Sequence, residues 1–165
     1  MSELHLDQNF RSLFDTHFEF VCRSLRRLGV READLADVAQ EVFVTAHRDY
    51  SEFEPDRSER AWLFGYARGF ASNYRKLGWH RGREIDNELP RSSPRLAARI
   101  DAMQIVSRGL ALLDEDKATA LILHDMEGLS APEISEELGV PLNTVYSRIR
   151  LAREAFRKAI EGPKS

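Results

Sequence analysis

Apolar residues recur along this chain at intervals of three and four, the spacing that places side chains on one face of an α-helix. Valine, isoleucine and threonine nowhere alternate with polar residues over a strand-length run. The pattern therefore predicts an all-α fold of two small helical modules joined by a linker. The predicted helices cover approximately residues 7–28, 35–48, 60–77, 96–113, 115–127, 131–138 and 142–160.

Capping and helix-ending residues set the predicted boundaries. Asp34 is placed to cap the second helix, and Gly78 is placed to end the third. In the second half, Asp114 is a good N-cap for the fifth helix. Ser130 and Glu133 have the S-x-x-E spacing of a capping box, so a further helix is expected to begin there.

One polar segment divides the chain. Residues 80–95 include Gly82, Pro90 and Pro94 and lack helical apolar periodicity, as is typical of a linker. The predicted organisation is an N-terminal module, a linker and a C-terminal helix-turn-helix module, at residues 1–81, 82–95 and 96–165.

The composition favours a folded cytoplasmic protein. Hydrophobic residues make up 42% of the 165 residues, enough to build compact cores. Cys22 is the single cysteine, so no disulfide can form within the chain and a reducing compartment is expected. No run of 18 apolar residues occurs, and the N-terminal segment lacks the pattern of a secretory signal, so we expect no membrane association.

The sequence contains no recognisable catalytic or metal-binding constellation. Its five histidines are dispersed, and none pairs with Cys22 at a metal-binding spacing. It has no P-loop and no G-x-G-x-x-G motif. We therefore expect no enzymatic activity, no cofactor, no metal and no small-molecule substrate.

Charge alternates in blocks, although the net charge is only −3. Residues 31–54 hold seven acidic and two basic residues, whereas residues 57–83 hold seven basic and one acidic. Residues 125–137 hold five acidic and no basic residues, and residues 142–160 hold five basic and one acidic. Each basic block is a candidate for contact with phosphates, and the alternative for any one block is a solvated helix face.

Residues 128–153 have the pattern of a helix-turn-helix: a short capped helix, a turn at Gly139 and a longer basic helix. If the apolar residues of the two helices pack together, the polar residues of the second helix point outward. These are Asn143, Thr144, Tyr146, Ser147, Arg148 and Arg150. Such a helix fits the major groove and can read base edges or phosphates there. The alternative is a structural helix pair in an ordinary bundle; the combination of capping box, glycine turn and basic helix favours DNA binding.

The same segment, GLSAPEISEELGVPLNTVYSRIRLARE, resembles the promoter-binding C-terminal module of sigma factors, most of all the extracytoplasmic-function group. Regulators of the response-regulator type share part of this pattern, and the N-terminal half separates the two families. EADLADVAQEVFVTAHRD, residues 32–49, is similar to the sigma segment that binds core RNA polymerase. RAWLFGYARGFASNYRKLGWHR, residues 60–81, resembles the segment that contacts the minus-ten promoter element. The resemblance implies a bacterial sigma factor that binds core polymerase, selects promoters and assists strand opening. An anti-sigma factor is a further partner in many relatives.

The resemblance also implies roles for particular residues. Those implied to bind core polymerase are Asp37, Gln40, Glu41 and Phe43. Those implied to contact the minus-ten element are Ser58, Arg60, Tyr66, Arg68, Asn73, Arg75 and Lys76. The outward residues of the last helix are implied to contact the upstream, minus-thirty-five element. A mixture of basic and aromatic side chains suits a helix that holds unpaired bases, whereas we expect Trp62 and Phe70 to lie largely in the core.

The chain departs from the family pattern at four positions. Gly69 and Asn73 stand where the family usually has Asn and Asp, and Tyr146 and Leu151 stand where basic residues are common. These departures predict a promoter preference different from that of better-known relatives. Two alternatives come from other function classes. One is a DNA-binding regulator that acts without polymerase, usually as a dimer on a symmetric site. The other is an enzyme or small-ligand domain, which the absence of a catalytic constellation disfavours.

Overall fold

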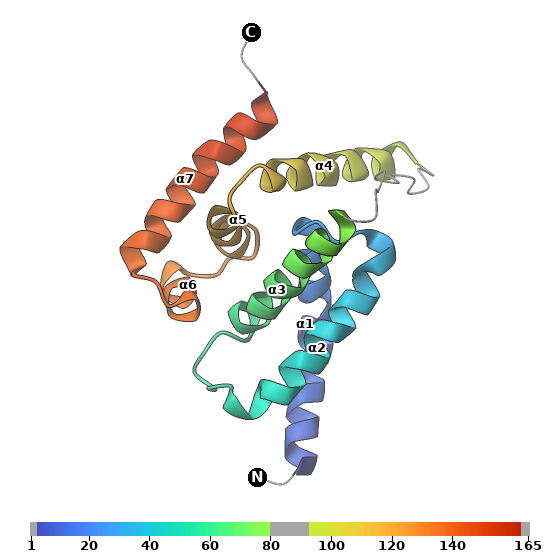
Figure 1. Ribbon diagram of the computed structural model, residues 1–165, viewed down its shortest axis with the longest axis vertical. Coiled ribbons are helices and arrows are strands. Elements are labelled where there is room, and N and C mark those ends of the chain that lie inside the picture. Colours follow the sequence, from blue (N-terminus) through green and yellow to red (C-terminus); the bar gives the residue numbers. More distant parts are fainter. Residues whose placement is uncertain (1–2, 80–92, 163–165) are drawn as a thin grey trace.

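The computed structural model describes residues 3–79 and 93–162, and within these ranges every regular element is a helix or helical turn (Figure 1). The prediction of an all-α fold is therefore confirmed. The helices are α1 (Glu3–Arg27), α2 (Leu35–Asp49), α3 (Glu59–Trp79), α4 (Pro94–Ala111), α5 (Glu115–Leu121), α6 (Ala131–Leu138) and α7 (Leu142–Glu161). Short 3-10 turns η1 (Glu32–Asp34) and η2 (Tyr50–Glu52) flank α2, and a π-helical turn η3 (Ile122–Met126) extends α5. None of the helices in the described ranges has the length and apolar character needed to span a membrane.

Helices α1, α2 and α3 pack together as the N-terminal module (Figure 1). An aromatic cluster joins α1 to α2, because Phe14 and Phe18 lie with ring centroids 4.7 Å and 6.2 Å from that of Phe43. Leu63 and Phe64 of α3 are at most 1% exposed and close the core on its other side. Burial of such large side chains is the main favourable contribution to folding of this module.

Helices α4 to α7 form the C-terminal module, in which α7 packs on α4, α5 and α6. The approach of α4 to α7 depends on Gly109, which is buried. A Cβ atom at that position would lie 2.6 Å from Cε2 of Phe156, closer than van der Waals contact allows. The small residue therefore lets the two helices lie side by side.

The structure confirms one of three predicted helix-boundary residues and differs at the other two. Asp114 caps α5 by accepting a hydrogen bond from the Lys117 amide at 2.9 Å, as predicted. Asp34 occupies the N-cap position of α2 but makes no capping hydrogen bond, because its carboxylate is bound by the Arg31 guanidinium at 2.9 Å. Gly78 does not end α3, which continues to Trp79.

The predicted linker 82–95 falls mostly outside the described residues. Its last part is helical, since α4 begins at Pro94 and the Ser93 hydroxyl accepts a hydrogen bond from the Leu96 amide at 3.2 Å.

The two modules lie against each other, α4 contacting α1 and α6 contacting α3 (Figure 1). Their buried apolar residues form one continuous core cluster. We call this packing the closed arrangement. It governs which candidate site residues are accessible.

Candidate nucleic-acid interface

Local interactions fix the geometry of α6 and α7. The Ser130 hydroxyl accepts a hydrogen bond from the Glu133 amide at 3.3 Å, and the Glu133 carboxylate accepts one from the Ser130 amide at 2.7 Å. This reciprocal pair is the predicted capping box. Gly139 ends α6 in the left-handed conformation, with φ 63°, where residues with a Cβ atom are disfavoured. The two helices therefore form the helix-turn-helix that the sequence predicted.

Helix α7 has one buried and one exposed face. Val145, Ile149 and Ala152 are at most 3% exposed. The candidate base-contacting residues lie away from this buried stripe. Asn143, Tyr146, Ser147 and Arg150 are exposed, and Thr144 and Arg148 are half-buried. The structure thus brings the six predicted residues onto one helix and leaves four of them open to a partner.

Two arginines of α7 are paired within the C-terminal module. Arg148 Nη2 lies 3.1 Å from Oδ2 of Asp116 on α5. The Arg153 guanidinium donates two hydrogen bonds of 2.6 Å to the Asp125 carboxylate in η3. These hydrogen bonds hold the pKa of Asp125 below its ordinary value. Arg150 and Arg157, the other two arginines of α7, are exposed.

The first turns of α3 hold polar residues in fixed positions. The Ser58 hydroxyl accepts a hydrogen bond from the Ala61 amide at 3.3 Å and so helps to begin the helix. The Tyr66 hydroxyl donates a hydrogen bond to Asp49 at 2.7 Å, and burial together with this carboxylate raises the pKa of Tyr66. Trp62 is 9% exposed and belongs to the core, as predicted, whereas Phe70 is half-buried.

The basic residues of α3 are mostly engaged inside the molecule. Arg60 donates a hydrogen bond to the carboxylate of Glu127 at 3.1 Å, and Arg68 Nε lies 3.6 Å from Oε1 of Glu115. Arg75 donates a hydrogen bond to the carbonyl of Leu28 at 2.6 Å. Arg75 is nevertheless exposed, as are Asn73 and Lys76. In the closed arrangement, most of the predicted minus-ten surface is therefore occupied by the protein's own groups.

The predicted polymerase-binding residues of α2 divide into surface and core. Asp37, Gln40 and Glu41 are exposed. Phe43 is 3% exposed and packs in the aromatic cluster, so in this structure it supports the surface from beneath instead of lying on it. Val44, four residues after Gln40, is 56% exposed and adds an apolar group to the same surface. Val44 was not among the residues predicted from the sequence, although its helical spacing from Gln40 places both on the same face of α2.

Among the described residues, the carboxylate that receives the most hydrogen bonds, that of Glu127, was not predicted from the sequence. Glu127, just after η3, receives hydrogen bonds from Arg23, Arg27 and Arg60 of the other module. No local motif connects these positions, since Arg23 and Glu127 are 104 residues apart.

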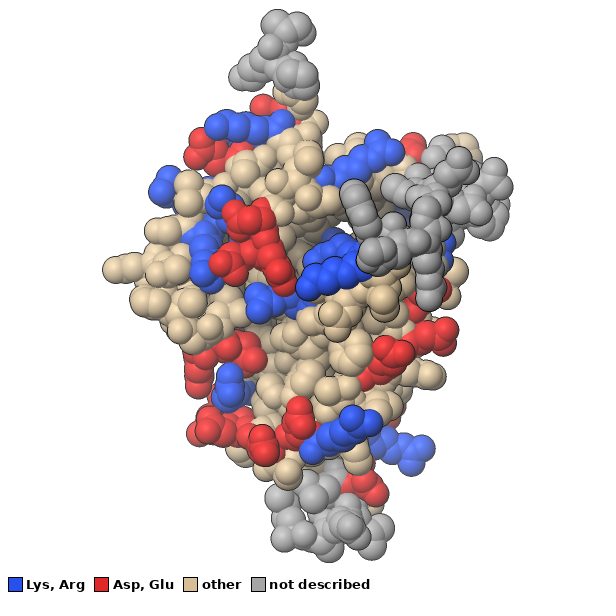
Figure 2. Space-filling model, in the orientation of Figure 1, with Lys and Arg blue, Asp and Glu red and all other residues tan. Residues whose placement is uncertain are grey.

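The distribution of charge on the surface is consistent with the pairing of acidic and basic side chains. Figure 2 shows acidic and basic side chains intermingled over the visible face, without one continuous basic surface. Among the described residues, no group of three or more His, Cys, Asp or Glu side chains could hold a metal ion.

Comparison with known proteins places both halves of the chain in one family. Residues 13–80 match the model of sigma-70 region 2, and residues 103–156 match that of sigma-70 region 4. The chain is 30% identical over 158 residues to the RNA polymerase sigma factor CnrH of Cupriavidus metallidurans, covering 87% of this chain and 82% of CnrH. It is 30% identical over 169 residues to the ECF RNA polymerase sigma-E factor of Escherichia coli, covering 94% of this chain and 88% of that protein.

Comparison with solved structures supports the same family assignment. The structure of CnrH in complex with the cytosolic domain of CnrY matches with a TM-score of 0.72 and 28% identity, over 96% of this chain and 91% of that one. The sigma factor RpoE in complex with the anti-sigma factor NepR from Bartonella quintana shares the fold, with a TM-score of 0.70 and 21% identity, over 95% of this chain and 99% of that one. This protein therefore belongs to the extracytoplasmic-function (ECF) sigma factors of RNA polymerase.

Proposed function

We propose that this sigma factor divides its work among three helices. The exposed face of α2 binds core RNA polymerase, α3 holds the minus-ten element as the strands separate, and α7 enters the major groove of the upstream element. The polymerase carries out the chemistry, and the chain itself acts inside the cell as a promoter-selecting subunit without a cofactor.

The helix-turn-helix is the observation that carries this proposal. Its capping box and left-handed Gly139 fix α7 relative to α6, and its buried stripe directs Asn143, Tyr146 and Arg150 toward solvent. A helix held in this way can present amide, hydroxyl and guanidinium groups to base edges. The basic and aromatic composition of α3 suits a single strand, because cations bind its phosphates and rings stack on its bases.

A protein partner is a second part of the proposal. The structure of CnrH contains the cytosolic domain of CnrY. Since this chain matches CnrH along nearly its whole length, we expect it to bind a regulatory protein of the anti-sigma class as well. A DNA-binding regulator that acts without polymerase is less well supported. That alternative does not explain why the segment that contains α2 matches sigma-70 region 2.

Run-off transcription tests the function directly. Purified chain is added to core polymerase on a library of genomic promoter fragments from its own host, with core polymerase alone as the control. The expected result is a set of transcripts that depends on the chain and whose start sites share two upstream sequence elements. Transcription no more specific than with core polymerase alone, together with tight binding of the free chain to a symmetric site, would support the regulator alternative instead.

A further inference from the structure

The Glu127 carboxylate is the centre of the contact between the modules. Its side chain is 3% exposed. Arg23 donates two hydrogen bonds to it, at 3.2 Å and 3.0 Å, and Arg27 and Arg60 donate one each. Arg60 also donates to the Glu127 backbone carbonyl. We call these three residues of α1 and α3 the arginine cluster.

The three guanidinium groups of the arginine cluster are stable at this spacing only with a negative charge between them. Without it, like charges would face each other across a partly buried space, which is unfavourable at these distances. Guanidinium groups bind carboxylates and phosphates in the same planar, forked geometry. The arginine cluster is therefore built to hold an anionic group, and Glu127 supplies that group in the closed arrangement.

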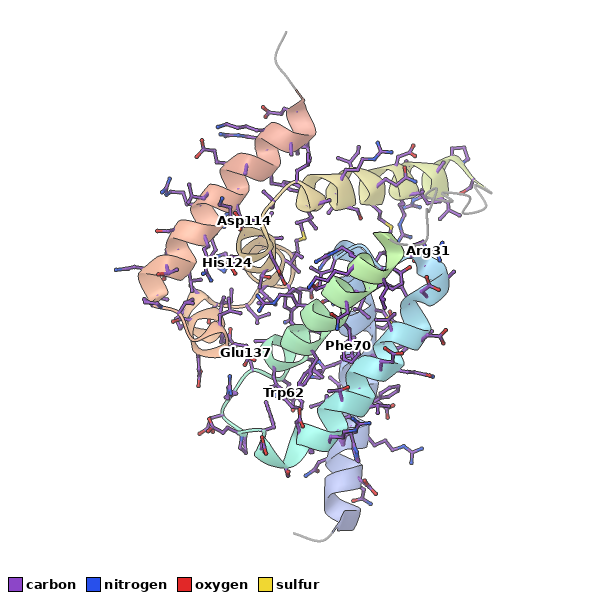
Figure 3. The ribbon with its side chains drawn as sticks, in the orientation of Figure 1. Arg31, Trp62, Phe70, Asp114, His124 and Glu137 are labelled. Atoms are coloured by element: carbon purple, nitrogen blue, oxygen red, sulfur yellow. The ribbon has the colours of Figure 1, made fainter. Side chains whose placement is uncertain are left out.

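Further ion pairs between the modules have the same polarity. Arg57 donates a hydrogen bond to Glu137 at 2.8 Å, and Arg68 faces Glu115. Glu137 projects from α6 toward α3 (Figure 3). In each pair the base belongs to the N-terminal module and the acid to the C-terminal module. Acids of one module thus cover the bases that the other would present to DNA.

The contact next to the arginine cluster is not tightly packed. A pocket of about 270 Å³ lies between α1, α3, α4 and α5, and its lining includes Arg27, Arg75 and Glu115. The modules also share buried apolar residues, but the ion pairs between them weaken in salt and the pocket lacks packing contacts, so the contact is weaker than a completely filled apolar core. This makes the closed arrangement suited to reversible opening.

From these contacts we infer that Glu127 stands in for a DNA phosphate: it holds the modules closed, and when they separate the arginine cluster binds a phosphate of the promoter backbone. The inference rests on the proposed function, since Arg60 belongs to the predicted minus-ten surface. It adds Arg23 and Arg27 to the DNA-binding residues and assigns Glu127 an autoinhibitory role. Promoter DNA and Glu127 then compete for the same three side chains.

Small-angle X-ray scattering of the free chain at low salt tests the closing role. A closed chain of this length has a radius of gyration of about 15 Å. Glu127→Gln keeps the shape and removes the charge, so its radius of gyration is expected to exceed that of the wild type by several ångström. Glu161→Gln, which removes the same charge from the exposed end of α7, is the control. A radius of gyration equal to that of the control overturns the closing role.

A second variant guards against misfolding. If circular dichroism shows that Glu127→Gln has lost helix, Arg23→Gln with Arg27→Gln breaks the same contact from the other module. This double variant is also expected to be expanded. A folded double variant that stays as compact as the wild type overturns the closing role equally.

Fluorescence anisotropy with promoter DNA opened at the minus-ten element tests the phosphate site. Glu127→Gln is expected to raise the affinity of the free chain about fivefold or more, because the binding-competent population grows. Adding Arg23→Gln and Arg27→Gln to this variant should remove most of the gain and reduce the salt slope by about one. A gain that survives both arginine changes overturns the phosphate site.

Run-off transcription distinguishes a failure of this inference from a failure of the proposed function. If wild-type chain initiates transcription while Glu127→Gln changes neither compactness nor DNA affinity, the inference fails and the proposed function stands. If neither chain supports specific initiation with core polymerase, the proposed function fails.

Discussion

Nη2 of Arg148 lies 3.1 Å from Oδ2 of Asp116, which holds a guanidinium of α7, the proposed DNA-facing helix, against α5 of its own module. Arg150, two residues further on, is exposed. Helices place residues two apart on different faces, so these neighbouring arginines have different surroundings and different expected roles.

Arg150→Ala is expected to weaken binding of the polymerase–sigma complex to the upstream promoter element. If Arg150 makes a bidentate contact with guanine, the loss is about 1–3 kcal/mol and confined to one base position. If it contacts a phosphate, the loss is uniform across sequences and the salt slope falls by about one. Titration of duplex promoters carrying single base changes, at several salt concentrations, distinguishes the two.

Arg148→Ala is the matched comparison. Because Asp116 already neutralises this guanidinium, we expect a smaller effect on DNA binding and a loss of at most about 1 kcal/mol in the stability of the C-terminal module. Unchanged upstream binding in Arg150→Ala, with a large loss in Arg148→Ala, would mean that a different face of α7 meets the DNA.

The stability of the closed arrangement should depend on pH through Glu127. Burial alone would raise the pKa of this carboxyl, but the hydrogen bonds and charges of Arg23 and Arg27 outweigh burial and lower the pKa. A carboxyl whose pKa falls on folding contributes stability that is complete above its unfolded pKa of about 4.3 and is lost as the pH falls through the folded pKa. Glu127→Gln should therefore cost about 1–3 kcal/mol at pH 7, and thermal unfolding should show this difference from wild type shrinking below about pH 4.

Glu137 provides the opposite case in the same contact. Burial raises its pKa and outweighs the opposing effect of Arg57. A group with a raised folded pKa contributes stability that is present below its unfolded pKa and is lost as the pH rises through the folded pKa. Glu137→Gln is expected to be neutral or slightly stabilising at pH 7. A loss in Glu137→Gln as large as that in Glu127→Gln would contradict this account, because Glu137 has one arginine partner and a raised pKa whereas Glu127 has three arginine partners and a lowered pKa.

Local sequence features predicted the local structure well, because their interactions span only a few residues. The capping box of Ser130 and Glu133 and the turn at Gly139 depend on neighbours three to five positions away, and both were confirmed. Asp34 shows the limit of this reasoning. Its position suits a cap, but the Arg31 guanidinium, brought within reach by the turn before α2, binds its carboxylate instead.

Long-range contacts were beyond the sequence patterns. The charge blocks correctly identified α3 and α7 as basic, yet they could not show that acids of the C-terminal module neutralise Arg60 and Arg68. Phe43 illustrates the same limit in the core. The family motif associates it with the polymerase-binding segment, whereas packing against Phe14 and Phe18 of α1 buries it. Only the arrangement of helices in space determines such contacts.

Substitution by alanine should change the stability in opposite directions at two helical glycines, Gly109 and Gly69. A Cβ atom at Gly109 would lie 2.6 Å from the Phe156 ring and 3.2 Å from Cγ2 of Ile160. Gly109→Ala is expected to destabilise the C-terminal module by about 1–3 kcal/mol, because overpacking between α4 and α7 exceeds the gain in helix propensity. Thermal unfolding followed by circular dichroism measures this change.

Gly69 is the control. It lies in α3 and is exposed, and a Cβ atom at this position would have no neighbouring atom within 4 Å. Gly69→Ala should therefore stabilise the chain by up to about 1 kcal/mol, since only the backbone preference changes. If Gly109→Ala is as stabilising as Gly69→Ala, the Phe156 ring moves aside freely and the glycine is not needed for the approach of α4 to α7.

The exposed face of α2 is expected to account for much of the affinity for core polymerase. Gln40→Ala with Glu41→Ala removes an amide and a carboxylate from this face without touching the buried residues Val42 and Phe43. The fold should stay intact, because surface substitutions away from caps and networks usually change stability by less than about 0.5 kcal/mol. Binding to core polymerase, measured by titration of labelled chain, should weaken by about tenfold or more, which is the effect of truncating the few residues that dominate an interface.

Gln8→Ala with Asp15→Ala is the matched control, because it removes the same two kinds of group from exposed positions of α1. This control should bind core polymerase like the wild type. Val44→Asp, which places a charge on the apolar part of the α2 face, should weaken binding further, since a charge buried at an interface without a partner is strongly unfavourable. Wild-type affinity in both α2 variants would show that core polymerase binds elsewhere, and the assignment of α2 would then be wrong even though the chain is a sigma factor.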